Sequence, residues 1–367
     1  MERERYMRRA LELAEHGWGR VSPNPLVGAV IVRHDEIVGE GWHEGPGTPH
    51  AEIAALRAAG TRAREATLFT TLEPCNRFGR TPPCTRAVIE SGLAHVVVAA
   101  ADPNLGEGQP GILEVRSAGV RVETGVLTGE AERQNAAFFT HVRTGRPFVL
   151  LKMASTLDGK VAAGDGSSRW ISGEAARADV QRLRAWADAI LVGAGTALAD
   201  DPALTVREHA FSLARRPTRV LADTTGRVPA GGKIFDRSAP TLVATTDAAP
   251  EGRVREWRDA GAEVAILGRD ASGGVSLADL VEHLGKLDVQ GLLLEGGPTI
   301  AWSAVRDGIV DSVVLYVAPS ILGGIAAPGA VGGGGFSPVA DALRLDIAHV
   351  DRLGDDLRVV ADVHRDR

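Results

Sequence analysis

The sequence has only two cysteines in 367 residues, too few for a framework of disulfides. A reducing compartment is therefore expected, and we predict a cytoplasmic protein. No apolar run reaches membrane-spanning length, and the first residues lack the apolar core of a signal peptide. Aromatic residues make up only 4% of the chain and the net charge is −6. A base-stacking surface or a basic groove for nucleic acid is therefore not expected.

The length of 367 residues exceeds that of a typical single domain, so two domains are expected. Short apolar runs alternate with helical patterns in both halves, which predicts an α/β fold in each. Strands are expected at 26–32, 66–72, 95–100, 120–125, 148–154, 188–193, 218–223, 241–246, 262–267, 291–297 and 311–319. Helices are expected at 7–14, 51–59, 84–91, 174–187, 251–260, 277–285 and 299–307, and in a stretch that ends at Gly145. Turn residues after Gly145 divide the chain into domains 1–145 and 146–367.

Both cysteines lie in a motif with metal-binding chemistry. His50 and Glu52 open one predicted helix, and Cys84 opens another. Cys75 follows a predicted strand. A helix N-terminus favours the thiolate, which is the form that binds zinc. Two sulfurs and one imidazole leave a fourth position for water, as catalytic zinc sites do, and Glu52 is placed to move a proton of that water.

The H-x-E…P-C pattern is typical of zinc deaminases that act on nucleobases, although here eight residues separate the two cysteines. Two alternatives stay open. The residues could be ordinary core or surface groups that fall together by chance. The zinc could also be structural, although only His43 stands nearby as a fourth ligand.

The segments "SPNPLVGAVIV", "GEGWHEGPGTPHAE" and "TLEPCNRFGRTPPC" resemble the deaminase domain of the bifunctional riboflavin-biosynthesis deaminase/reductase, a branch of the cytidine-deaminase-like superfamily. The resemblance implies a zinc site made by His50, Cys75 and Cys84, with Glu52 as the catalytic proton shuttle. It also implies substrate contacts by Asn24, Arg80 and Thr81. One departure is Arg77, which stands where the family usually has a histidine.

The second half has no G-x-G-x-x-G after its first strand, so a standard Rossmann domain is not supported. Two other strand ends, "DAILVGAGT" and "GLLLEGGPT", carry glycines that would let the backbone approach a pyrophosphate. Such glycines are also common in plain turns. Lys152 closes the apolar run "FVLLK", at the strand end where open α/β sheets bind ligands.

The segments "LKMASTLDGK", "WIS", "ADAILVGAGTALADDPALTVR" and "LLEGGPT" resemble the reductase domain of the same bifunctional enzyme, which has a dihydrofolate-reductase-like α/β fold. The resemblance implies NADPH contacts at Ala154, Trp170, Thr196, Asp200, Thr224, Gly297, Pro298, Thr299, Ile300, Ala301, Trp302 and Ser303. It implies substrate contacts at Ser168, Arg184, Leu204, Arg207 and Glu295. Lys152, Asp200 and Glu295 are the catalytic candidates that would polarise or protonate the substrate. Arg184 and Arg207 suit a sugar phosphate, because guanidinium pairs bidentately with phosphate oxygens.

The function expected from both halves is a two-step enzyme of riboflavin biosynthesis. Zn²⁺-dependent deamination of 2,5-diamino-6-(5-phosphoribosylamino)pyrimidin-4-one would precede NADPH reduction to 5-amino-6-(5-phosphoribitylamino)uracil. The partner would be this small phosphorylated pyrimidine, with no nucleic acid and no membrane, and the family resemblance implies a homo-oligomer. One alternative is a nucleoside or RNA-base zinc deaminase fused to an unrelated reductase domain. Another is a reductase whose first domain is an inactive zinc scaffold.

Overall fold

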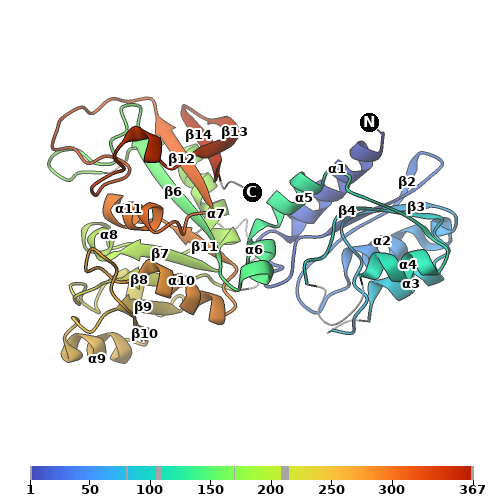
Figure 1. The fold of residues 1–367 in the computed structure, drawn as a ribbon, viewed down its shortest axis with the longest axis horizontal. Helices are drawn as coiled ribbons and strands as arrows, with labels where there is room; N and C mark the ends of the chain where they lie inside the picture. Colours follow the sequence, from blue (N-terminus) through green and yellow to red (C-terminus); the bar gives the residue numbers. More distant parts are fainter. Residues whose placement is uncertain (1, 80–81, 105–109, 169, 208–214, 365–367) are drawn as a thin grey trace. The chain divides into compact units, whose positions relative to one another are not determined.

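The computed structural model describes residues 2–79, 82–104, 110–168, 170–207 and 215–364 (Figure 1). These residues form two compact units, which divide between Gly145 and Arg146. Each unit is a sheet covered by helices, so the predicted α/β class is confirmed. None of the helices within the described ranges is long and apolar enough to cross a membrane.

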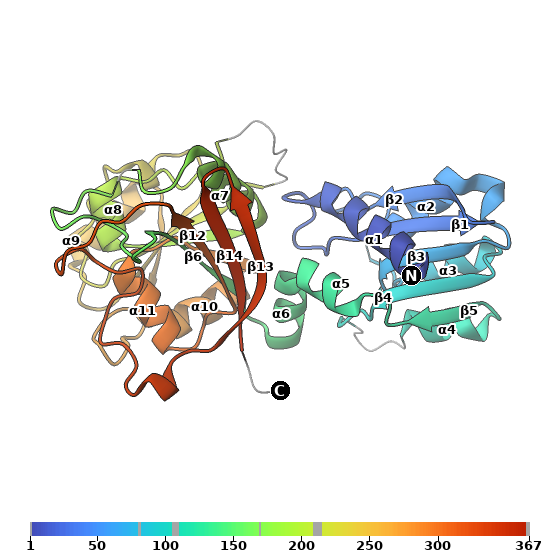
Figure 2. The ribbon, with the colours of Figure 1, turned by 90° about the horizontal axis from the view of Figure 1, so that it is seen from above.

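The first unit is built on a five-stranded sheet of order β2-β1-β3-β4-β5. β1 is antiparallel to both of its neighbours, whereas β3, β4 and β5 run parallel. The strands are β1 (Gly28–Arg33), β2 (Glu36–Trp42), β3 (Thr67–Leu72), β4 (His95–Ala100) and β5 (Arg121–Thr124). The helices are α1 (Glu2–Ala14), α2 (Ala51–Ala59), α3 (Cys84–Glu90), α4 (Gly111–Ser117), α5 (Thr128–Gln134) and α6 (Ala136–Thr144). Figures 1 and 2 show α1 and α5 on one face of this sheet and α2, α3 and α4 on the other.

Glycines set how closely α1 and α2 approach the sheet. A Cβ on Gly28 would lie 1.9 Å from the carbonyl oxygen of Ala10 in α1. On the opposite face, a Cβ on Gly41 would lie 2.5 Å from the carbonyl oxygen of Ala51, in the first turn of α2. Real Cβ atoms do not tolerate such distances. Gly41 therefore determines the depth at which α2 begins, next to His50 and Glu52.

The second unit is built on a nine-stranded sheet of order β10-β9-β8-β7-β11-β6-β12-β14-β13. The first seven strands in this order are parallel, and β14 and β13 are antiparallel. The parallel strands are β6 (Phe148–Thr156), β7 (Ala189–Gly193), β8 (Thr218–Ala222), β9 (Thr241–Thr245), β10 (Glu263–Ile266), β11 (Gly291–Leu294) and β12 (Ser312–Ala318). The closing hairpin is β13 (Leu345–Leu353) and β14 (Asp356–Val363). Short 3₁₀ helices lie at Glu15–Gly17 and Gly60–Ala63 in the first unit and at Lys233–Phe235 and Val339–Asp341 in the second.

Helices cover both faces of this second sheet. Its helices are α7 (Glu174–Trp186), α8 (Ala194–Asp200), α9 (Glu251–Asp259), α10 (Leu277–Lys286) and α11 (Pro298–Arg306). Val149 and Leu151 of β6 share a core with α10 and α11, whereas Leu150 between them shares a core with α7, α8 and α9. Strands buried on both faces read as continuous apolar runs, which is the pattern seen in the sequence.

Several elements were not expected from the sequence. β2, α4, α8 and the hairpin of β13 and β14 were missed, whereas the expected strands and the other helices are confirmed apart from their ends. The helix expected to run to Gly145 is instead two helices, which meet at Asn135. Asn135 is buried, and its side-chain amide exchanges hydrogen bonds of 2.7 and 2.8 Å with the backbone of Leu26. A buried tertiary contact therefore holds the chain at the point where the helix breaks.

Candidate active sites

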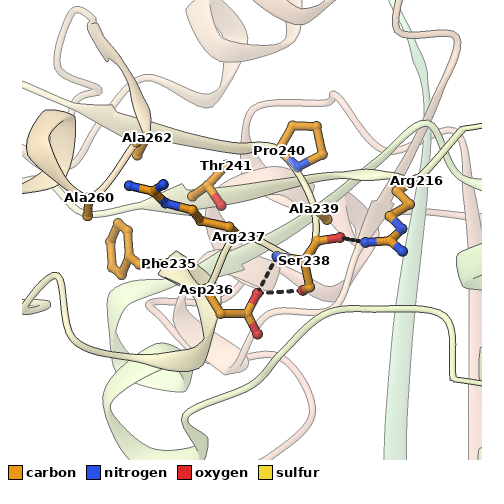
Figure 3. A pocket seen from close by; sticks show the side chains of 11 residues that line it. Arg216, Phe235, Asp236, Arg237, Ser238, Ala239, Pro240, Thr241, Ala260 and Ala262 are labelled. Atoms are coloured by element: carbon orange, nitrogen blue, oxygen red, sulfur yellow. Dashed lines mark hydrogen bonds between the residues drawn. The ribbon is translucent and has the colours of Figure 1, made fainter.

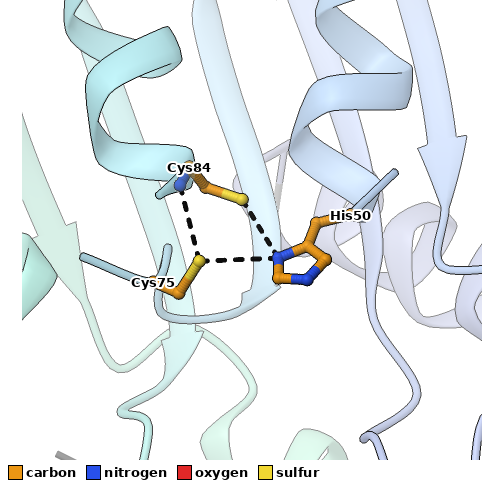
Figure 4. Close-up of side chains that lie close together, drawn as sticks. All are labelled: His50, Cys75 and Cys84. Atoms are coloured by element: carbon orange, nitrogen blue, oxygen red, sulfur yellow. Dashed lines mark hydrogen bonds between the residues drawn. The ribbon is translucent and has the colours of Figure 1, made fainter. Parts of the chain in front are cut away.

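Three side chains of the first unit converge into a candidate metal site. Nδ1 of His50 lies 3.2 Å from Sγ of Cys84 and 3.5 Å from Sγ of Cys75 (Figure 4). The three donor atoms all lie within 4.8 Å of one another. His50 immediately precedes α2, Cys75 follows β3, and Cys84 is the first residue of α3. The carboxyl end of one strand and the N-termini of two helices thus meet at one point.

The electrostatics of this cluster suit a cation. Hydrogen bonds from Cys84 and His50 lower the pKa of Cys75 to about 4, against the opposing effect of burial. The same Cys75–Cys84 hydrogen bond, together with burial, raises the pKa of Cys84. A thiolate, a second sulfur and an imidazole nitrogen form the donor set of a zinc site that keeps one position open. The residues present therefore fit zinc.

Glu52 lies beside these ligands in the first turn of α2 and is buried. Burial raises the pKa of its carboxyl group to about 7. A carboxyl group with such a pKa can both take up and release a proton near neutral pH.

His43 is not available as a fourth ligand, because both of its ring nitrogens have partners. Its Nδ1 lies 3.3 Å from the carbonyl oxygen of Pro49 and donates to it, which leaves Nε2 to accept from Nδ2 of Asn24 at 2.9 Å. Burial lowers the pKa of His43, which agrees with a neutral ring. The His43 ring packs edge-on against His50, with 5.4 Å between the ring centroids. The predicted substrate residue Asn24 is thus linked through His43 to the metal cluster.

Of the remaining residues predicted for this site, Arg80 and Thr81 lie outside the described residues. Arg77 forms an ion pair of 3.2 Å with Asp102 and a hydrogen bond of 3.1 Å with Asn104. Its guanidinium group is therefore held by the segment that follows β4.

The second unit contains a cavity of about 900 Å³ at the carboxyl ends of β6, β7, β8 and β11. This position is typical of ligand sites in open parallel sheets. The predicted site residues that line it are Lys152, Ala154, Ser168, Thr196, Asp200, Thr224, Glu295, Gly297, Pro298, Thr299, Ile300 and Ser303. Residues from distant parts of the sequence are thereby brought to one cavity.

The two glycine-containing strand ends meet in this cavity. The Thr196 hydroxyl lies 3.2 Å from the place where a Cβ on Gly297 would stand. A Cβ on Gly296 would lie 1.9 Å from Cγ2 of Ile300, so only glycine fits there. Gly296 is thus required by the packing of Ile300, whereas Gly195, at the other strand end, has no atom of the described residues within 4 Å of the place of a Cβ and leaves its backbone open to a phosphate-bearing ligand.

Arg184 and Glu295 form a bidentate ion pair, in which Glu295 lines the cavity, and the substrate contacts predicted for both stay predictions. Nε and a terminal nitrogen of Arg184 donate to the two Glu295 oxygens at 2.6 and 2.9 Å. Burial raises the pKa of Glu295, but the charges of Arg184 and Lys152 outweigh it and hold the pKa below its ordinary value. Arg184 therefore has no free fork for a phosphate. The lowered pKa of Glu295 favours a hydrogen-bond acceptor over a proton donor at this position.

Lys152 does not close its strand, contrary to the sequence expectation, because β6 continues to Thr156. Lys152 nevertheless lines the cavity. The last residue of β11, Leu294, pairs with Leu151 on β6, so no residue of β11 pairs with Lys152. Its Nζ lies 6.0 Å from the ring centroid of Tyr316 and makes no hydrogen bond or ion pair within the described ranges. Burial lowers the pKa of Lys152, and the charge of Glu295 opposes that effect.

Six predicted contact residues of the second unit lie outside the cavity lining, and Arg184 is one of them. Trp170 is exposed and has the guanidinium of Arg177 4.8 Å from its ring centroid. Leu204 is buried in a left-handed backbone conformation, with φ of +48°. Arg207 is exposed, Ala301 is buried in the core, and Trp302 packs on Phe336 beside a separate cavity. Their contacts with cofactor or substrate stay predictions.

Sequence reasoning missed part of the cavity. Arg227 in the turn after β8 and Asp270 in the loop after β10 both line it. The available signal was a turn-forming stretch directly after each of two apolar runs, "TTGR" and "RDASGG". Both stretches follow strands that end at the same edge of the sheet.

Comparisons with known proteins give the class of each unit. Residues 1–100 match the model of the cytidine and deoxycytidylate deaminase zinc-binding region, and residues 147–359 match the RibD C-terminal domain. The chain thus joins a deaminase unit to a reductase unit, which implies zinc and a nicotinamide cofactor.

Relatives over the full length specify the family. The riboflavin biosynthesis protein RibD of Aquifex aeolicus is 41% identical over 354 residues, which cover 96% of each chain. That of Escherichia coli is 40% identical and covers 97% of this chain and 98% of its own. The structure of Acinetobacter baumannii RibD matches with a TM-score of 0.86 and 36% identity over 99% of both chains. A deaminase/reductase of Thermotoga maritima matches with a TM-score of 0.84 and 35% identity, also over 99% of both. This chain belongs to the RibD family of riboflavin biosynthesis proteins.

Proposed function

We propose that this chain deaminates 2,5-diamino-6-(5-phosphoribosylamino)pyrimidin-4-one in its first unit and reduces the ribosyl group of the product with NADPH in its second. The observation that carries the proposal is the convergence of His50, Cys75 and Cys84 next to the buried carboxyl group of Glu52. An inactive zinc scaffold would need the three ligands but not that carboxyl group. The Thermotoga maritima relative is described as a deaminase and reductase for this class of compound.

In the deamination, His50, Cys75 and Cys84 would hold zinc, which supplies an activated water when bound. Glu52 takes a proton from the attacking water at its carboxylate and passes it to the pyrimidine ring nitrogen. It then takes the proton of the hydroxyl group left on the ring carbon and delivers it to the departing ammonia. Its pKa of about 7 supports both directions of transfer. Asn24 would orient the pyrimidine, and its hydrogen bond to His43 supports this role.

In the reduction, NADPH supplies the hydride, and the chain positions the two reactants. Lys152 is the group that we assign to polarise and protonate the reacting ribose oxygen, because its ammonium is free of hydrogen bonds within the described ranges and its pKa is lowered by burial. Glu295 stays ionised beside Arg184 and accepts hydrogen bonds from the substrate. Asp200 lines the same cavity from the end of α8.

We further propose a cytoplasmic homo-oligomer. Neither cysteine forms a disulfide, which suits a reducing compartment. Apolar side chains on β13 are exposed, among them Ile347 at 68% and Val350 at 58%. Because β13 is the outer strand of its sheet, a second copy could cover these side chains.

The test measures ammonia release from the diaminopyrimidine substrate, first without NADPH and then with it. We expect ammonia in both cases, and NADPH oxidation only after deamination. Glu52→Gln should abolish ammonia release while zinc content stays at one per chain. Glu114→Gln, on the exposed surface of α4, is the matched control. Absence of ammonia release while the deaminated intermediate is still reduced would refute the deaminase assignment and support the scaffold reading.

A further inference from the structure

The cavity of the second unit has a second charged region, at the ends of β8 and β10. Arg227 and Asp270 line it there, whereas Lys152 and Glu295 line it at β6 and β11. In the sheet, β8 is three positions away from β6. The usual spacing of strands makes this separation about 14 Å. An extended dinucleotide with its reacting ring near Lys152 would therefore carry its other end toward Arg227.

Arg227 stands on a turn that is rigidly held. The buried carboxylate of Asp223 accepts hydrogen bonds from the N–H groups of Gly226 at 3.1 Å and of Val228 at 2.7 Å. These two residues flank Arg227 on either side. Gly226 has φ of +74°, which other residues rarely adopt. Trp257 Nε1 donates to the carbonyl oxygen of Val228 at 2.9 Å.

The side chain of Arg227, by contrast, has no partner among the described residues. It is exposed and makes no hydrogen bond or ion pair with any part of the chain that the structure describes. The neighbouring carboxylate of Asp270 does not neutralise it, because that group pairs with Arg306 at 2.6 Å and accepts hydrogen bonds from Ser272 and Gly274. A fixed backbone that presents a free guanidinium to a cavity is an anion-binding arrangement.

The position of Asp223 bears on which dinucleotide is accepted. An acidic residue after a strand end can hydrogen-bond the ribose 2′-hydroxyl of NADH. Asp223 directly follows β8, but both of its oxygens are bound to backbone N–H groups of its own turn. The carboxylate of Asp223, which could bind the ribose of NADH, is thus already hydrogen-bonded within its own turn. The adjacent guanidinium of Arg227 favours a phosphate instead.

We propose that Arg227 binds the 2′-phosphate of NADPH and selects this cofactor against NADH. The proposal rests on the reduction assigned above to the second unit. The anion could alternatively be the phosphate of the pyrimidine substrate, which the geometry favours less, because Arg227 stands at the end of the cavity remote from Lys152. The experiment separates these two.

The kinetic test compares Arg227→Gln with the parent enzyme in reduction of the deaminated intermediate. We expect kcat/KM for NADPH to fall by about 10- to 100-fold, the effect of losing a charge-assisted hydrogen bond. The values for NADH and the KM of the substrate should stay within about threefold of the parent. Arg227→Lys should restore part of the loss. Arg237→Gln is the matched control. Arg237, like Arg227, makes no hydrogen bond or ion pair with the described residues. It lines a different cavity, at the amino end of β9 (Figure 3). Equal losses with NADPH and NADH, or a raised substrate KM with unchanged cofactor kinetics, would overturn the assignment.

A binding test does not depend on turnover. Calorimetry should show that 2′,5′-ADP binds the full-length protein more tightly than AMP, and that Arg227→Gln removes the difference. If the parent fails to reduce the intermediate yet shows this preference, the function proposed above is wrong and the phosphate site stands. If the parent binds both nucleotides equally, the phosphate site is wrong whatever the activity.

Discussion

Removing the charge of Glu295 should destabilise the second unit, because it leaves the guanidinium of Arg184 buried without its counterion. The side chains of Arg184 and Glu295 are only 11% and 8% exposed. After the substitution Glu295→Leu, Arg184 would keep only its hydrogen bond of 3.1 Å to the carbonyl oxygen of Thr205. Breaking one side of such a buried pair costs about 3–5 kcal/mol of unfolding free energy.

Replacing both partners should cost far less than the two single changes together. Arg184→Met combined with Glu295→Leu removes both charges and fills similar volume, which is often neutral. The carbonyl of Thr205 then loses its donor, at about 1 kcal/mol. Lys152 also loses the favourable charge of Glu295, so the double variant should not exceed the parent in stability.

The assay is urea unfolding of the parent, both single variants and the double variant, followed by circular dichroism, with a coupling free energy taken from the cycle. Because the chain has two units, the transition of the second unit must be fitted separately. A coupling energy of at least about 2 kcal/mol is expected. Additive single effects would refute the reasoning that the pair is a coupled, buried unit.

The same pair sets a pH dependence with a definite sign. The pKa of Glu295 is held below its ordinary value, so the unfolded chain binds more protons here than the folded chain. Its stabilising contribution is complete above the unfolded pKa of about 4.3 and is lost as the pH falls through the folded pKa. The stability difference between the parent and Glu295→Leu should therefore shrink in acid. A difference that grows below that pH would contradict the assigned direction.

Three further outcomes are expected. Cys75→Ser should lower zinc content, measured by atomic absorption, and abolish ammonia release, while reduction of the deaminated intermediate continues; loss of both activities would contradict the separation of the two sites. Lys152→Met should lower kcat of reduction by at least about 100-fold, the usual effect of losing a general acid, while raising the free energy of unfolding by about 1 kcal/mol. Because burial lowers the pKa of Lys152, that gain should be complete below the folded pKa and should fade as the pH rises toward the unfolded value of about 10.4, which urea titrations at several pH values would show. Gly28→Ala should lower the melting temperature sharply, since its Cβ would lie 1.9 Å from the carbonyl oxygen of Ala10. Gly129→Ala on α5, where a Cβ would meet only the flexible end of Arg133 at 3.6 Å, should leave the melting temperature unchanged or raise it. Equal effects of the two substitutions would show that the close approach of α1 to the sheet does not limit stability.

The parts of the fold that the sequence predicted are those in which one local pattern decides the structure. Parallel strands buried on both faces read as apolar runs, and these were placed within a few residues. The hairpin of β13 and β14 was missed because most of its residues are exposed or half-buried, so polar residues interrupt its apolar ones. The break at Asn135 was missed because it depends on a contact with Leu26, more than a hundred residues away in the sequence.

For the candidate sites, residue types could be predicted but their partners could not. His50, Cys75 and Cys84 were recognisable because zinc restricts its ligands to few residue types at helix and strand ends. The protein partner of Arg184 could not be predicted, because a guanidinium pairs equally well with a phosphate and with a carboxylate. Only the folded chain shows that two hydrogen bonds of Arg184 go to Glu295 and a third to the carbonyl oxygen of Thr205.

One physical feature explains why the strand ends were nevertheless informative in both units. Cys75 follows the parallel strand β3, and the large cavity lies at the ends of four parallel strands. At such ends the backbone leaves the sheet with unpaired polar groups, so turns, glycines and helix N-termini gather there. A turn that binds its own acidic residue, as Asp223 does, leaves the neighbouring side chain free for a ligand. In a parallel sheet, a polar side chain that follows an apolar run and makes no hydrogen bond within its own turn is therefore the first candidate for a ligand contact.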